Sequence, residues 1–87
     1  MTDTSILERL QKVVASVAGP TKTPPDAGPD TLLGDGGFWL DSVDLVEVVV
    51  ACESEFAVTF EGETDLTQDA LHSVRTLADL IASKAPR

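Results

Sequence analysis

The sequence predicts an all-α fold, and three features of the 87-residue chain support this prediction. Apolar residues recur three and four positions apart in several segments, which is the spacing of amphipathic helices. Clusters of glycine and proline separate those segments. The one alternating apolar stretch, residues 57–60, is too short and too isolated to build a sheet. Because 87 residues make one domain, we expect a single helical domain over residues 1–87.

The first helix is expected over residues 5–18. Ser5 followed by Glu8 fits a capping box, in which two side chains satisfy free amide groups at a helix start. Gly19 and Pro20 are expected to end the helix, because glycine favours a helix end and proline cannot continue one. The apolar residues at helical spacing form one face: Ile6, Leu7, Leu10, Val13, Val14 and Val17.

A long connection is expected over residues 19–41, which hold most of the glycines and prolines of the chain. A loop of this length inside a compact domain is commonly functional or is held by its own side chains. A linker between two domains is the rival interpretation, but the helical segment before it is too short to fold alone. The expected anchors are Leu32, Leu33, Phe38, Trp39 and Leu40.

The second helix is expected over residues 42–56. Asp41 is a good N-cap, so Ser42 would be the first helical residue. Its hydroxyl would then lie at the positive end of the helix, where a phosphate diester is electrostatically favoured. The same residues also fit an ordinary capped helix without a ligand. A stripe of apolar residues faces the core: Leu45, Val48, Val49, Cys52 and Phe56.

A second apolar stripe, formed by Val43, Val46 and Val50, lies beside the core stripe on this helix. Two apolar stripes on one helix mean that the rest of the chain covers both, or that one stays free for a partner. The sequence leaves both possibilities open. Three acidic residues border the apolar positions: Asp44, Glu47 and Glu53.

Two further helices are expected in the last third of the chain. Thr67 is a plausible cap for a short helix over residues 68–72. The final helix is expected over residues 74–84, directly after Ser73. Its inner face contains Val74, Leu77, Leu80 and Ile81.

The composition limits the possible partners and location. Fifteen acidic residues against six basic ones give a net charge of −9, which argues against binding to nucleic acid or anionic membranes. A partner with a basic docking surface is the natural counterpart. The chain has a single cysteine, no apolar run of membrane-spanning length and no signal-like N-terminus, so we expect a cytoplasmic domain.

The chain shows no constellation that is typical of an enzyme or a metal site. Cys52 lies on the core stripe without a basic neighbour in sequence, so a buried structural role is favoured over a reactive thiol. His72 is the only histidine, and no metal-ligand spacing or nucleotide cradle is present. Near Ser42, only the acidic Asp41 and Asp44 are candidates for a general base. We therefore expect no catalytic residue and no metal site.

The region around Ser42 resembles the modification site and second helix of an acyl carrier protein, with a gapless match from Leu40 to about Phe60. The resemblance implies a four-helix carrier bundle with a long first loop and a very short third helix. It identifies Ser42 as the attachment point of 4'-phosphopantetheine. The residues that carry it are Asp41, Ser42, Val43, Asp44, Val46, Glu47, Glu53, Ser54, Glu55 and Phe56.

The resemblance also implies a function and a set of partners. The expected function is to hold acyl groups as thioesters. The chain is expected to act as a stand-alone monomer and not to be an enzyme itself. The expected partners are a phosphopantetheinyl transferase and acyl-loading and acyl-processing enzymes with basic docking surfaces. By the resemblance, Asp41 and Val43 bind the cofactor together with Ser42, and Leu71 and Val58 lie near enough to shelter cargo. The implied recognition residues are Asp44, Val46, Glu47, Val50 and Glu53.

The sequence departs from the patterns of carrier proteins in two places. Carrier sequences often have glycine three residues before the serine, where this chain has Trp39. Peptidyl carriers typically show Gly-Gly-His-Ser-Leu, and Leu40-Asp41-Ser42-Val43 is closer to the acyl type. The loop and tail favour a specialised pathway, such as polyketide assembly, over primary fatty-acid synthesis. The alternatives are a peptidyl or aminoacyl carrier, and an unmodified acidic helical module whose second stripe binds a partner.

Overall fold

The computed structural model describes residues 4–34 and 36–84, and this part of the chain is helical without any β-strand. The all-α prediction is therefore confirmed for the described residues. The predicted four-helix bundle is not confirmed, because the described part of the chain contains only three helices longer than one turn. The elements are α1 (Thr4–Lys22), α2 (Ser42–Phe56), the four-residue α3 (Gly62–Asp65) and α4 (Val74–Lys84).

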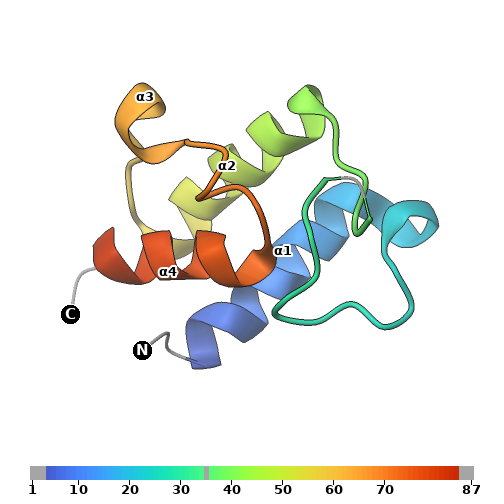
Figure 1. Ribbon diagram of the computed structural model, residues 1–87. Coiled ribbons are helices and arrows are strands. Elements are labelled where there is room, and N and C mark those ends of the chain that lie inside the picture. The colour runs from blue at the N-terminus through green and yellow to red at the C-terminus, as the bar shows by residue number, and fades with distance from the viewer. Residues whose placement is uncertain (1–3, 35, 85–87) are drawn as a thin grey trace.

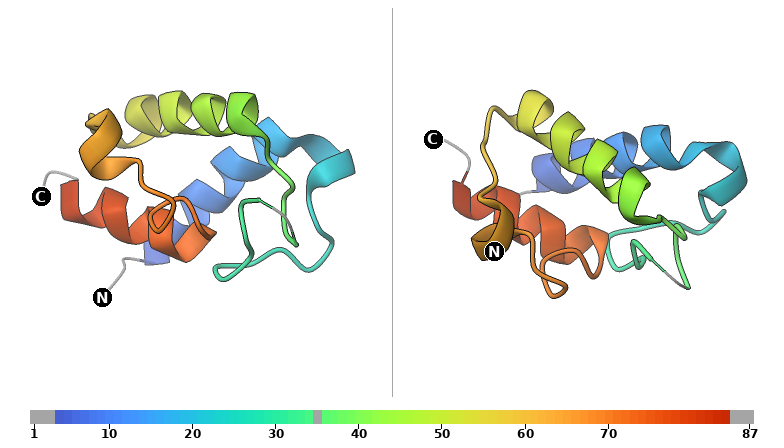
Figure 2. Two further views of the ribbon diagram at one scale, coloured as in Figure 1. Left: turned by 45° about the horizontal axis from the view of Figure 1, so that its top comes forward. Right: turned by 90° about the horizontal axis from the view of Figure 1, so that it is seen from above.

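The three longer helices enclose the core. Helix α1 contacts both α2 and α4, and Figure 1 shows it passing behind α4 and below α2. The connection between α1 and α2 lies at one end of the molecule and α3 at the other, as the two views of Figure 2 also show. The buried apolar residues are Leu7, Leu10, Val14, Leu33, Phe38, Leu40, Val48, Cys52, Phe56, Val58, Phe60, Val74, Leu77, Ala78 and Ile81.

Helix α1 is broken near its end. Gly19 has φ 77° and ψ 171°, outside the helical region, and Pro20 follows it. The expected end at Gly19 is therefore where the regular helix stops, but one further turn continues to Lys22. Thr23 closes this turn, because its amide and its hydroxyl both donate to the Gly19 carbonyl, at 3.0 and 2.8 Å. The break sets the direction in which Lys22 leaves α1.

Backbone hydrogen bonds fasten the α1–α2 connection to the start of α4. The Leu33 amide donates to the His72 carbonyl, and the Val74 amide donates to the Thr31 carbonyl, at 3.0 and 3.1 Å. Leu32 and Ser73 form an isolated antiparallel bridge between the same two segments. The connection is thus part of the same domain as the helices, which disfavours the interpretation of a linker between two domains.

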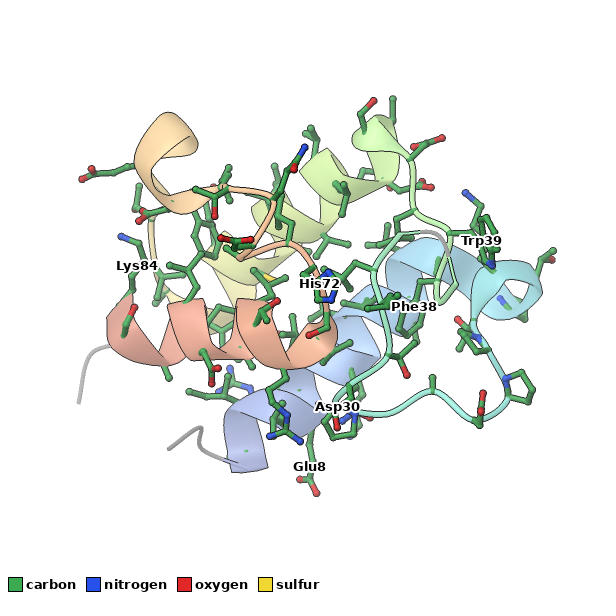
Figure 3. The ribbon with its side chains drawn as sticks, viewed as in Figure 1. Glu8, Asp30, Phe38, Trp39, His72 and Lys84 are labelled. Carbon is green, nitrogen blue, oxygen red and sulfur yellow. The ribbon has the colours of Figure 1, made fainter. Side chains whose placement is uncertain are left out.

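The expected anchors of this connection are confirmed except for one. Leu33, Phe38 and Leu40 are buried, and Leu32 is partly buried. Trp39 is 59% exposed, so the expectation that it anchors the loop is wrong. Its backbone is left-handed, with φ 57°, and its side chain lies outside while both neighbours face inward. Figure 3 shows the Trp39 ring at the periphery and the Phe38 ring inside.

The predicted helix over residues 68–72 is also wrong. Residues 68–71 form turns, and the four-residue helix occurs earlier, at Gly62–Asp65. Thr67 does cap a turn, since its hydroxyl oxygen accepts from the Ala70 amide at 3.2 Å. The turn cannot propagate into a helix, because His72 and Ser73 are drawn into the backbone pairing with Leu32 and Leu33. The expected bounds of α2 and α4 are confirmed.

Candidate functional site

The site is built on the capped start of α2. Asp41 has an extended backbone, and its Oδ1 accepts from the Asp44 amide at 2.8 Å. In return, Oδ2 of Asp44 accepts from the Asp41 amide at 3.3 Å, which completes a capping box. The Leu45 amide donates to the Asp41 carbonyl, the first bond of the helical ladder, at 2.9 Å. The prediction that Asp41 is the N-cap is confirmed.

Ser42 is the first residue of α2 and is exposed to solvent. Within residues 4–34 and 36–84, no hydrogen bond engages its hydroxyl. The amide groups of Ser42 and Val43 precede the helical ladder and have no partner within the helix. The Ser42 hydroxyl is therefore accessible and lies where the helix dipole favours a negative group.

A salt bridge that the sequence did not predict joins the end of α1 to this helix start. Lys22 Nζ lies 2.7 Å from Asp44 Oδ2, so the last residue of α1 reaches the first turn of α2. The hydrogen bond from Lys22, followed by that from the Asp41 amide, holds the pKa of Asp44 below its usual range. The same hydrogen bond raises the pKa of Lys22. The signal for this salt bridge in the sequence is the pair Gly19-Pro20, because it predicts that the chain changes direction just before Lys22.

The second apolar stripe of α2 is uncovered. Val43, Val46 and Val50 are 65%, 61% and 59% exposed, so none of the described residues buries them. We call these three residues the exposed stripe. Glu47 is exposed beside it, three residues from Val50 and four from Val43 on the helix. Of the two possibilities that the sequence left open, the described structure shows the uncovered one. An exposed apolar stripe of this kind is a candidate interaction surface.

The other two acidic residues at the border of the stripes have partners within the chain. Asp44 is only partly exposed and is held by Lys22. Glu53 is also partly buried, and its Oε2 accepts from the Phe60 amide at 2.9 Å. The Glu53 carboxylate therefore stabilises the segment after α2. The structure thus brings Val46, Val50 and Glu47 together on an exposed face and places Glu53 in a structural contact.

A groove of about 360 Å³ lies between α2, the α1–α2 connection and the segment before α4. Leu45, one turn from Ser42, contributes its α2 wall. His72, which Figure 3 shows just before α4, also lines the groove. The resemblance implied that Leu71 and Val58 shelter cargo. Leu71 does line the groove, whereas Val58 is buried in the core. The lining residues are Leu32, Gly34, Leu45, Leu66, Gln68, Leu71 and His72.

Cys52 is a core residue, as the sequence predicts. Burial, with smaller contributions from the charges of Glu55 and Glu53, raises the pKa of its thiol to about 12. We expect iodoacetamide at pH 8 to alkylate Cys52 in the folded chain at least about 100-fold more slowly than in urea, because the thiolate is the reactive form. The measurement is the alkylation rate by mass spectrometry. Equal rates in the two conditions would contradict the buried position.

Comparison of the chain with known protein families, curated proteins and solved structures finds no match. None of the helices in the described residues is both long enough and apolar enough to cross a membrane. The geometry around Ser42 and the resemblance of the residues there are therefore the two indications of function.

Proposed function

We propose that the chain is an acyl carrier protein that receives 4'-phosphopantetheine on Ser42. The observation that supports this most is the combination at the start of α2. An exposed serine hydroxyl without a described partner stands at a capped helix N-terminus, directly beside the exposed stripe. A transferase needs access to the hydroxyl and a surface to dock on, and this end of α2 offers both.

The residues present fit the proposed group. The free amide groups of Ser42 and Val43 and the helix dipole favour the negative phosphodiester that would join the arm to Ser42. Asp41 occupies the cap and leaves those two amides available, because its side chain accepts from the Asp44 amide. When bound, the arm supplies a thiol that holds an acyl group as a thioester. The chain itself supplies the attachment point, the docking face and the tether that raises the effective concentration of cargo at each enzyme.

The docking face is acidic and apolar, which fits enzymes with basic surfaces. The exposed stripe and Glu47 would contact such a partner, and the net charge of −9 would speed its approach. The groove beside Leu45 and Leu71 is a place for part of the cargo. We further propose a monomer that works in the cytoplasm within a specialised biosynthetic pathway, such as polyketide assembly.

The proposal is tested by incubating the purified chain with coenzyme A and a broad-specificity phosphopantetheinyl transferase. We expect the intact mass to rise by one phosphopantetheine group per chain. If the chain stays unmodified while a known carrier in the same tube is modified, the carrier proposal is refuted. The exposed stripe would then favour the second candidate, an unmodified module that binds a partner protein through α2.

Val46 is expected to contribute to docking without contributing to folding, since its side chain is 61% exposed. Val46→Asp places a charge in the apolar contact and should lower the kcat/KM of the transferase about tenfold, which corresponds to about 1.4 kcal/mol. The free energy of unfolding should change by no more than about 0.5 kcal/mol. Ser16→Asp is the matched control, because it adds the same charge at an exposed position on α1 instead of α2. Equal kcat/KM values for the two variants would argue against docking on the stripe.

A further inference from the structure

We propose that Lys22 is an internal substitute for a cation of the docking partner. In the free protein the Lys22 ammonium group pairs with Asp44 Oδ2. A basic partner docks on α2 by displacing the ammonium group from this oxygen. The inference rests on the proposed carrier function, since it concerns the partners that would dock beside Ser42. It identifies Lys22 as a residue that weakens the binding of basic partners and so sets a threshold for recognition.

The geometry of the bridge makes Lys22, and not Asp44, the group that moves. Asp44 is held on two sides by the capping box, through its own amide to Asp41 Oδ1 and through Oδ2 from the Asp41 amide. Lys22 is attached by a single contact of 2.7 Å at the end of a long side chain that is 38% exposed. The backbone of Lys22 lies in the turn between Gly19 and Thr23, outside α2. The Lys22 side chain can therefore rotate away from Asp44 without moving the backbone of α2.

The strength of the bridge suits a reversible contact. Exposed and half-exposed ion pairs contribute little to stability, because each charge regains hydration and side-chain freedom when the pair separates. Both Lys22 and Asp44 keep part of their side chains in solvent. A partner cation that takes over the contact with Asp44 needs only a modest advantage to displace Lys22.

The surroundings define the partner as a protein surface with a lysine or arginine next to an apolar side chain. The exposed stripe begins at Val43, the residue before Asp44, so an apolar group and a cation would engage adjacent positions on α2. The departure of Lys22 leaves Asp44 Oδ2, two residues from Ser42, without a charged partner among the described residues. An acidic partner gains nothing from this release, and this restricts the proposal to basic occupants.

The test is a titration of the unmodified protein with an amphipathic helical peptide of lysine and leucine, followed by amide NMR. The shifts of Val43, Val46 and Val50 give both the affinity and the place of binding. Lys22→Gln is compared with Lys12→Gln, which removes the same charge from an exposed position on α1. We expect Lys22→Gln to bind the peptide about two- to five-fold more tightly than Lys12→Gln, the range that a surface ion pair implies.

A second comparison separates the bridge from a general charge effect. In the background of Asp44→Asn, which removes the charge but keeps a capping oxygen, adding Lys22→Gln should no longer tighten binding beyond the Lys12→Gln level. Equal affinities for Lys22→Gln and Lys12→Gln would overturn the proposal, as would the absence of shifts on the exposed stripe. Because the titration needs no modification of Ser42, its failure is distinct from failure of the transferase reaction.

Discussion

Ser42→Ala is expected to abolish the transfer of phosphopantetheine completely, because it removes the hydroxyl that the proposed site offers to the transferase. The fold should survive, since the Ser42 side chain is exposed and makes no hydrogen bond within the described residues. We expect the free energy of unfolding to change by no more than about 0.5 kcal/mol. The measurements are intact mass after the transferase reaction and urea unfolding followed by circular dichroism.

Ser54→Ala is the matched control for this experiment. Ser54 is also an exposed serine of α2, but it lies near the C-terminal end of the helix, away from the N-terminal amide groups. This variant should be modified as fast as the native chain. Modification of Ser42→Ala, or its loss in Ser54→Ala, would contradict the assignment of Ser42.

Gly37→Ala is expected to destabilise the fold by about 2–3 kcal/mol, the upper part of the range for overpacking, because the site cannot yield. A Cβ at this position would stand 1.9 Å from the Leu32 carbonyl oxygen, and contact with backbone cannot be relieved by rotating a side chain. That oxygen also accepts from the Phe38 amide at 2.9 Å, so moving it would disturb a buried residue. The measurement is urea unfolding, in which the midpoint should fall.

Gly34→Ala provides the control in the same loop, because a Cβ there meets nothing within 4 Å. Its unfolding midpoint should lie close to that of the native chain. If Gly37→Ala were as stable as Gly34→Ala, the close approach of Gly37 to Leu32 would be refuted. The position of Leu40 and the start of α2 would then need another explanation, because this turn leads directly into them.

The elements with local signals could be predicted from the sequence alone. The bounds of α2 follow from the Asp41 cap and from the apolar period that ends at Phe56, and both signals lie within the helix itself. The prediction of a helix over residues 68–72 was wrong because the conformation of this segment depends on contacts with a distant part of the chain. Thr67 gives a true capping signal, but the backbone of His72 pairs with Leu33, about forty positions away. A local pattern cannot reveal such a contact.

The candidate site, like the fold, was predictable where the signal is local and not where it depends on distant contacts. Ser42 and its cap follow from local residues, whereas the Lys22–Asp44 bridge depends on the direction that the chain takes after Gly19. Trp39 illustrates a residue whose environment the pattern concealed. Its left-handed backbone, with φ 57°, is a conformation that glycine adopts without strain, and glycine is what carrier sequences often have there. The left-handed backbone at Trp39 turns the ring outward, although an apolar ring would be expected to be buried.

The most direct test of the central proposal is to locate the added group. The native chain would be treated with coenzyme A and the transferase, digested, and sequenced by tandem mass spectrometry. We predict a single modified residue, Ser42, in the peptide that spans the start of α2. A group attached to any other residue, or no modified peptide in a reaction that modifies a known carrier, would contradict the proposal that this helix N-terminus is a carrier attachment site.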